Sequence, residues 1–194
     1  MDLSDILKIN YPVSENTLSD LYEHCTLIDI PKGEIIVEQG KRSNHLFFVS
    51  DGLFRVSFTH DGTEDTICFG QGGDPFMSLH SYYAKEPSQF SCIAMTNSKV
   101  YRITFPEFDM LLNRHIDLLQ WMKSLLTEQL YALERRYVHF SSRDAYSRFV
   151  NFVGARPEIM EIIPAKYIAQ YLNIRPETLY RLRARYLRGS QPAI

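Results

Sequence analysis

Short apolar runs separated by turn residues occupy the middle of the chain, from Leu27 to Ile103. Each run is four to six residues long, which is the length of a strand rather than of a helix. The turns between them contain Gly, Pro or Asp, and Asp61-Gly62 is the strongest hairpin signal. Many short strands at regular spacing are typical of an antiparallel sandwich or barrel. The predicted strands span 27–30, 34–37, 46–49, 53–58, 66–69, 90–95 and 99–103.

Helical spacing of apolar residues flanks this region on both sides. Residues 14–24 predict a short helix capped by Ser14, and a helical stretch opens at Pro106 and continues to about Phe140, with a break near Arg114-His115. The apolar stripe of the longer stretch is wide enough to contact two neighbours, the strand region and a second copy of the same helix. The alternative is a helix that packs only on its own domain. A polar residue in the seam between two copies would cost stability but help to fix the register. The predicted dimer seam consists of Leu118, Leu119, Met122, Leu126, Gln129 and Leu133.

The last thirty residues predict two short helices joined by a tight turn, after a further helix that restarts at Ser141. Asn173 lies at the turn, and Asn accepts a positive φ better than most residues other than Gly. Pro176 suits the first position of a helix, where its missing N–H would be unpaired in any case. The residues expected to face inward are Ile168, Ala169 and Leu172 on the first helix and Leu179, Leu182 and Tyr186 on the second.

The outward face of the second helix is rich in arginine and carries a carboxylate one turn from a guanidinium. Glu177 can accept a hydrogen bond from a cytosine amino group, and Arg181 can donate two to guanine. This pattern predicts a helix-turn-helix that enters the major groove of DNA. The alternative is an ordinary amphipathic helix with a solvated basic face. The predicted DNA-binding residues are Lys166, Gln170, Arg175, Glu177, Thr178, Tyr180, Arg181 and Arg185.

Charge is distributed unevenly along the chain. From residue 164 to 194 there are six Lys and Arg residues and one acid, a net of +5, whereas the whole chain is −2, so residues 1–163 carry −7. Positive charge gathered at one end is what a phosphate-contacting segment requires. Binding through phosphates would also be strongly salt-dependent.

Composition excludes several other classes of protein. A chain of 194 residues with 45% hydrophobic content can form a substantial core, and no apolar run is long enough to span a bilayer. The first residues are acidic and lack a signal-peptide pattern, and the three cysteines are scattered without a CxxC pair, which favours a cytoplasmic location and disfavours disulfides, zinc knuckles and iron–sulfur sites. The six histidines contain no His-x-His pair, and no nucleophile elbow, P-loop or dinucleotide fingerprint occurs. We therefore expect no enzyme and no metal, and a metal enzyme of cupin type is the less favoured alternative.

The order of these parts resembles the Crp/Fnr superfamily of bacterial transcription regulators. Residues 31–40 resemble its first β-roll hairpin, 48–52 its next glycine turn, and 101–108 the segment that leads into its long helix. The strongest match is 174–181, Ile-Arg-Pro-Glu-Thr-Leu-Tyr-Arg, which is similar to the recognition-helix pattern Arg-Glu-Thr-x-x-Arg. The resemblance implies that Glu177 and Arg181 read bases and that Thr178 lies near a phosphate. Pro176 stands where the family has its first Arg.

The segment that holds cyclic nucleotides in this superfamily departs from its pattern. Members that bind them carry Phe-Gly-Glu and then Arg-Ser/Thr-Ala, but the corresponding stretches 76–79 and 87–91 contain neither the Glu nor the Arg. Burying a phosphate without a paired cation is costly, so we expect absent or weak binding of cAMP and cGMP. The aromatic residues of this region form either an apolar effector pocket or plain core packing. The candidate pocket residues are Phe69, Phe76, Met77, Ser78, Gln89, Phe90 and Ser91.

The resemblance implies an α+β fold in three parts. These are a β-roll of double-stranded β-helix (jelly-roll) type with flanking helices (1–113), a long dimerisation helix and hinge (114–140, with the hinge at 140–142), and an all-α helix-turn-helix domain (141–194) whose wing is missing or vestigial. The expected function is a homodimeric regulator that binds a pseudo-palindromic operator. Its expected partners are double-stranded DNA, RNA polymerase and an unidentified small-molecule effector, with no membrane. The alternative is a sensor or scaffold whose helix-turn-helix contacts proteins.

Overall fold

The chain forms two compact units. A computed structural model describes residues 1–142, 144–155 and 157–189, except for the side chains of 139–142 and 189. The first unit comprises Met1–Glu64 and Cys68–Leu130, and the second comprises residues 65–67 and the described part of 131–194. The boundary at residue 130 falls inside the long helix α4 (Ile116–Ser142). The two units therefore share this helix, whereas the sequence predicted a separate part, 114–140, for it.

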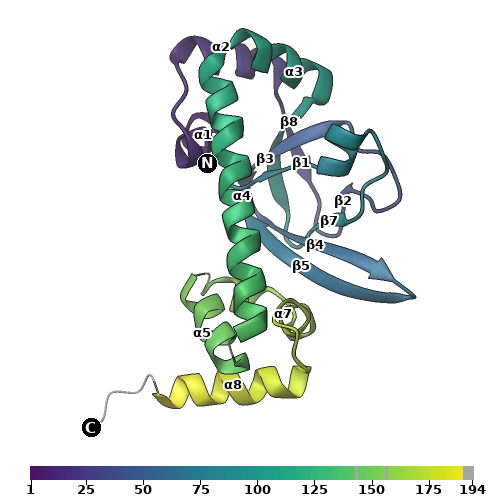
Figure 1. Cartoon of the computed structure of the whole chain (residues 1–194), viewed down its shortest axis with the longest axis vertical. Helices are drawn as coiled ribbons and strands as arrows, with labels where there is room; N and C mark the ends of the chain where they lie inside the picture. The colour runs from purple at the N-terminus through teal and green to yellow at the C-terminus, as the bar shows by residue number, and fades with distance from the viewer. Residues whose placement is uncertain (143, 156, 190–194) are drawn as a thin grey trace. The chain divides into compact units, whose positions relative to one another are not determined.

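Strands make up most of the chain between the second and third helices (Figure 1). The predicted strands are all present, each within a few residues of its expected bounds. In chain order the elements are α1 (Leu3–Asn10), α2 (Glu15–His24), β1 (Thr26–Ile30), β2 (Ile35–Val37), β3 (His45–Asp51), β4 (Leu53–His60), β5 (Thr63–Gln71), β6 (Pro75–Phe76), η1 (His80–Ala84), β7 (Ser91–Ala94), β8 (Ser98–Thr104) and α3 (Phe105–Arg114).

The strands pair into two four-stranded sheets, in the orders β1-β8-β3-β6 and β2-β7-β4-β5. The recorded registers are antiparallel, as the short alternating runs predict. Asp61 and Gly62, which join β4 to β5, both have positive φ (49° and 75°), as a two-residue hairpin turn requires. The rings of Phe54 on β4 and Phe76 on β6 lie 6.0 Å apart between centroids, so side chains from the two sheets meet in the interior.

Helices cover the outer face of the sheet that contains β3 and β8. The indole of Trp121 on α4 is fully buried, with its ring centroid 5.6 Å from that of Phe48 on β3 and 6.4 Å from that of Phe108 on α3. The first half of α4 is therefore part of the core of the first unit. The other fully buried residues of this core are Leu3, Ile6, Leu7, Leu21, Leu46, Ile103, Leu111 and Leu118.

Polar contacts fix the junction between α3 and α4. His115 interrupts the two helices with an extended backbone, at the predicted break, and its Nε2 lies 2.8 Å from Asp20 Oδ2. The Asp117 carboxylate accepts hydrogen bonds from the Ser14 N–H (2.7 Å) and the Thr17 hydroxyl (2.8 Å). Burial acts to raise the pKa of Asp117, but these hydrogen bonds outweigh it and hold the pKa below its usual value. The carboxylate thus ties the start of α2 to the start of α4.

The second unit contains α5 (Ala145–Ala155), α6 (Ile159–Ile162), α7 (Ala165–Tyr171) and α8 (Pro176–Gly189). Aromatic rings join these helices: Phe149 lies 5.9 Å from Tyr186, and Phe152 lies 5.2 Å from Tyr171, between ring centroids. Helix α4 continues through Ser142, so the hinge predicted at 140–142 lies in the last turn of that helix. Residues 190–194, where the sequence predicted a missing or vestigial wing, lie outside the described residues.

Four elements were not predicted: α1, β6, η1 and α6. Helix α1 buries Leu3, Ile6 and Leu7, and Asp2 caps it by accepting a hydrogen bond from the Ser4 N–H. The segment η1 is a single π-helical stretch, which has no apolar period of its own that a sequence pattern would reveal. Over the described part of the chain, the helices are too short or too polar to cross a lipid bilayer.

Candidate nucleic-acid interface

The turn between α7 and α8 is closed by two backbone hydrogen bonds. The Ile174 N–H donates to the Ala169 carbonyl (3.0 Å), and the Asn173 N–H donates to the Gln170 carbonyl (2.9 Å). Asn173 has φ of 51°, so the predicted positive φ is confirmed. This pair of bonds with one left-handed residue is a Schellman motif, which ends α7 and reverses the direction of the chain. Pro176 then opens α8, also as predicted.

The inner faces of α7 and α8 pack as the sequence indicated. Ile168, Ala169 and Leu172 are 1–2% exposed, and Leu179 and Leu182 are 2% and 7% exposed. Tyr186 completes the inner face of α8 through its contact with Phe149. A small side chain at Ala169 allows the two helices to approach closely. These buried positions fix which side of α8 is left to solvent.

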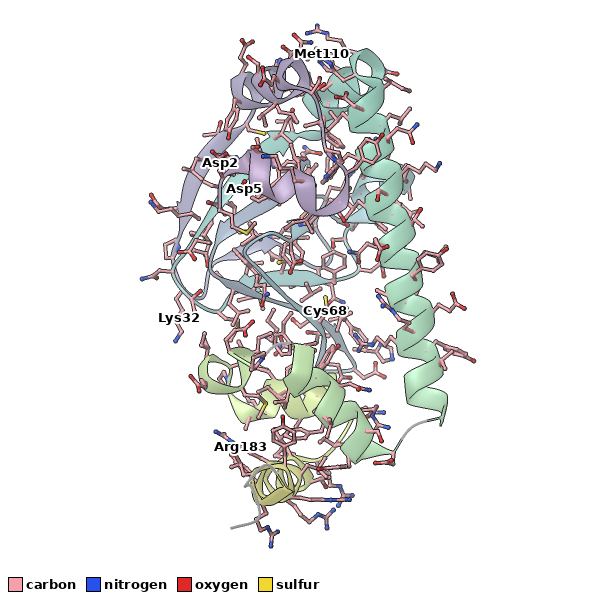
Figure 2. The ribbon with its side chains drawn as sticks, turned by 90° about the vertical axis from the view of Figure 1, so that its left-hand side faces the viewer. Asp2, Asp5, Lys32, Cys68, Met110 and Arg183 are labelled. Carbon is pink, nitrogen blue, oxygen red and sulfur yellow. The ribbon has the colours of Figure 1, made fainter. Side chains whose placement is uncertain are left out.

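The outer side of α8 carries the predicted base-reading pair. Glu177 and Arg181 are both exposed and lie one turn apart, on the side of the helix opposite Leu179 and Leu182. Tyr180, between them, is 60% exposed. Figure 2, which views α8 (yellow) nearly along its axis, shows nitrogen-tipped side chains projecting from it, with Arg183 labelled among them. A carboxylate and several guanidiniums therefore project from one helix.

The other predicted DNA-binding residues on α7, the turn and α8 differ in exposure. Arg185 lies with its guanidinium carbon 3.9 Å from the centre of the Tyr146 ring, and Lys166 Nζ lies 4.5 Å from that of Tyr167. Such cation–π contacts orient both cations while leaving their charge available. Gln170 and Thr178 are half-buried, whereas Lys166, Arg175 and Arg185 are exposed.

Arg183 and Arg188 also project from α8 but were not among the predicted site residues. Both are exposed, and Arg183 lines a cavity of about 150 Å³ between α6, α7 and α8. Both residues contribute to the net charge of +5 in residues 164–194. Their position in the sequence does not show whether they contact DNA or only water. The remaining lining residues are Met160, Ile163, Ala165, Ile168, Leu179 and Tyr180.

The candidate effector residues lie in the first unit, and their surroundings are partly apolar. Phe69 is buried, and the Phe76 ring fills the space in front of Gly70, where an added Cβ would lie 1.8 Å from Phe76 Cζ. Met77 and Phe90 are half-buried, whereas Gln89 is exposed. Phe76 therefore acts as packing between the sheets. This supports the alternative that the aromatic residues of this region are core.

Two buried hydroxyls in the stretches that lack the Glu and the Arg are satisfied within their own loops. Ser78 Oγ accepts from the Ser81 N–H (3.3 Å), and Ser88 Oγ donates to the Phe90 carbonyl (2.8 Å). Both residues are at most 1% exposed. Ser91 Oγ accepts from the Gln39 N–H (3.0 Å). Stretches 76–79 and 87–91 contain no Lys or Arg, so they do not fit a cyclic phosphate.

The apolar stripe of α4 divides differently from the predicted seam. Leu118 and Met122 are 0% and 3% exposed, because both belong to the core around Trp121, so their assignment to a dimer seam is wrong. Leu126 is partly buried against that core, and Gln129 is exposed. Among the described side chains of α4, the large apolar ones that remain exposed after Leu118 are Leu119 (45%), Leu130 (64%), Tyr131 (54%), Leu133 (64%), Tyr137 (75%) and Val138 (50%).

Cys25 and Cys92 are free thiols. Burial raises the pKa of Cys25 to about 12 and raises that of Cys92 still further, so both remain protonated at neutral pH. Within the described ranges, no three His, Cys, Asp or Glu side chains gather where they would hold a metal ion together. These features offer neither a reactive thiolate nor a ligand cluster.

Comparisons with known proteins give the same fold. Residues 27–115 match the family model of the cyclic nucleotide-binding domain. Among solved structures, FixK2 from Bradyrhizobium japonicum has a TM-score of 0.73 at 16% identity, covering 88% of this chain and 89% of that one. CLP, the c-di-GMP-responsive global regulator of Xanthomonas campestris, has a TM-score of 0.71 at 12% identity, covering 91% and 93%. The catabolite activator protein of Thermus thermophilus has a TM-score of 0.58 at 18% identity, covering 91% and 84%.

No protein with a curated description matches the sequence. The described chain therefore has the fold of these three proteins, and residues 27–115 are similar to a cyclic nucleotide-binding domain; at these identities the likeness concerns the fold.

Proposed function

We propose that this protein is a transcription regulator that binds duplex DNA as a homodimer through a helix-turn-helix formed by α7 and α8. The observation that carries the proposal is the two-sided character of α8. Its inner side, Leu179 and Leu182, is buried, whereas its outer side presents Glu177 and Arg181 to solvent. A helix held in this way presents a rigid row of polar side chains to the floor of the major groove.

The exposed side chains of α8 suit two kinds of contact with DNA. Arg181 can donate two parallel hydrogen bonds to guanine O6 and N7, and Glu177 can accept one from cytosine N4. The surrounding cations, among them Arg175 and Arg185, suit phosphates on either side of the groove. Phosphate contacts position the helix but carry no sequence information, so specificity depends on the Glu177–Arg181 pair.

Helix α4 provides the surface for the dimer. Leu119, Leu126, Leu130, Leu133 and Tyr137 are separated by intervals of seven, four, three and four residues, and Lys123 fills the gap in the first interval. Alternating intervals of three and four residues are those of a two-stranded coiled coil. A two-fold dimer would place two α8 helices in successive major grooves, about 34 Å apart, so the operator would be a pseudo-palindrome.

The proposed regulator responds weakly or not at all to cAMP and cGMP. A cyclic phosphate in the first unit would need a cation among residues 76–79 and 87–91, and these stretches contain none. The Ser78 and Ser88 hydroxyls already bond within their own loops. Any other effector would have to displace Phe76 from its contacts with Phe54 and Gly70 or bind elsewhere.

The proposal is tested by selecting binding sites from a random duplex pool at near-physiological salt, with and without cAMP. The expected result is a two-fold symmetric site that is enriched equally in both conditions. The Arg181→Ala variant should lose most of the specific binding, because a good bidentate contact contributes about 1–3 kcal/mol of discrimination in each half-site. The Arg42→Ala variant is the matched control, because Arg42 is an exposed arginine of the first unit. Equal selection by the wild type and Arg181→Ala would refute base reading by Arg181.

A protein-binding role for the same helices is the second candidate. The cavity beside Tyr180 is lined mainly by apolar side chains, and Ile162 and Leu187 in the same unit are 49% and 58% exposed. Apolar surface of this kind suits protein contacts more than phosphate contacts. This candidate predicts no sequence enrichment in the selection and only weak, salt-sensitive binding to bulk DNA.

A further inference from the structure

Tyr180 is an exposed aromatic residue on the side of α8 that carries the candidate base-reading pair. It lies three residues after Glu177 and directly before Arg181, and 60% of it is exposed. Residues three and four apart share a helix face, so Glu177, Tyr180 and Ala184 line one side. The aromatic residue that packs inward from α8 is Tyr186, against Phe149. The aromatic contact between α8 and α5 is thus made by Tyr186 and Phe149.

Tyr180 lies at the edge of the cavity between α6, α7 and α8, which it lines together with Leu179 and Arg183. A tyrosine has only two side-chain torsions, so it offers a large contact area at a low cost in conformational entropy. A phosphate contact would use only its hydroxyl and leave the exposed ring in water. The exposed ring instead suits an apolar group on the partner.

The major groove presents one apolar group, the 5-methyl of thymine. We infer that Tyr180 is a third base-contacting residue, whose ring packs against a thymine methyl next to the bases read by Glu177 and Arg181. Ala184 supports this arrangement, because it is exposed one turn further along the same side and its short side chain lets the helix approach the groove floor. The inference rests on the proposed function and adds to it one specificity-determining residue.

The size of the effect follows from the burial of one methyl group. Removing a methyl from water is worth about a fourfold change in Kd for each half-site. Deoxyuridine differs from thymidine only by this methyl, so replacing single thymines of the selected operator with deoxyuridine isolates the contact. The expected result for the wild type is one thymine per half-site whose replacement weakens binding about fourfold, and about fifteenfold when both half-sites are replaced.

Variants of Tyr180 assign that effect to the ring. Tyr180→Ala should bind thymine and deoxyuridine operators equally, whereas Tyr180→Phe should keep the preference, because it keeps the ring. Tyr83→Ala is the matched control, since Tyr83 is 59% exposed in the first unit and should keep the full methyl effect. Circular dichroism checks that each variant is folded.

Three results would overturn the inference. Wild-type binding that is insensitive to every thymine replacement would refute it, as would a methyl effect that persists in Tyr180→Ala. A methyl effect lost in Tyr180→Phe would assign the contact to the hydroxyl and refute packing by the ring. Failure of the wild type to select any symmetric site is a different outcome, because it refutes the proposed function itself.

Discussion

Replacing Leu130 with alanine is expected to weaken the proposed dimer without unfolding the monomer. Leu130 and Leu133 are each 64% exposed in the single chain and lie on successive turns of α4. Leu118 and Met122 on the same helix are buried in the core of their own unit, so substitutions there would report on folding instead. The two exposed leucines thus separate dimerisation from stability.

The magnitude can be worked out from the exposed fraction of the side chain. Fully burying a leucine side chain contributes about 1.5–3 kcal/mol, so covering the two thirds of Leu130 that remain exposed would contribute roughly 1–2 kcal/mol per copy. A two-fold interface contains the contact twice, which gives roughly 2–4 kcal/mol in total. Leu130→Ala should therefore raise the dimer Kd about 30- to 1000-fold.

Sedimentation velocity over a range of protein concentrations measures this change directly. The matched control is Leu27→Ala, since Leu27 is 49% exposed on β1 and away from α4. Thermal unfolding of both variants at low concentration shows whether the monomer is intact. A dimer Kd that changes less than threefold in Leu130→Ala and in Leu133→Ala would refute the seam along the exposed side of α4.

Three further substitutions test features of the fold. Asn173→Ala should lower the free energy of unfolding by about 1 kcal/mol, because φ is 51° there, whereas Asn173→Gly should not lower it; urea unfolding measures both. Asp117→Asn should lower the free energy of unfolding by about 1–3 kcal/mol at pH 7, because the amide weakens the hydrogen bonds from Ser14 and Thr17. The pKa of Asp117 is lower in the folded state than in the unfolded state. The carboxylate therefore contributes its full stabilisation above the unfolded pKa near 4 and loses it as the pH falls through the folded pKa. The difference in unfolding free energy between wild type and Asp117→Asn should thus shrink below about pH 4. Gly70→Ala should lower the melting temperature, because overpacking against Phe76 costs about 1–3 kcal/mol. Phe76→Leu in the same chain should restore part of the lost melting temperature. A melting temperature of Gly70→Ala equal to that of the wild type would show that Phe76 does not fill this space.

Local chemistry explains why the sequence predicted the turns correctly. Asp61-Gly62 and Asn173 both adopt the positive φ that their residue types favour, because a tight turn depends on the few residues within it. Helix α1 had such signals too, in the cap Asp2 and the buried spacing of Leu3, Ile6 and Leu7, and could have been predicted from them. The strands followed from short apolar runs for the same local reason.

Long-range packing explains what the sequence could not decide. The stripe on α4 was broad enough for two neighbours, but its sequence did not show which leucines faced which neighbour. The indole of Trp121, packed on Phe48 and Phe108, turns Leu118 and Met122 inward and leaves Leu130 outside. Arg183 is a similar case, since its place beside a cavity depends on α6 and α7 rather than on its neighbours in α8.

If the proposed regulator does not respond to cyclic nucleotides, it needs another means of control, and its own concentration is the simplest. The Ser78 and Ser88 hydroxyls bond within their loops, whereas the leucines of the proposed seam are exposed in the single chain. If two α8 helices must bind together, operator occupancy rises with the square of the monomer concentration as long as the protein concentration is below the dimer Kd. The concentration for half-occupancy then varies as the square root of the dimer Kd. A 30- to 1000-fold rise in that Kd in Leu130→Ala would thus shift operator half-occupancy by about 5- to 30-fold, although no residue of α8 has changed.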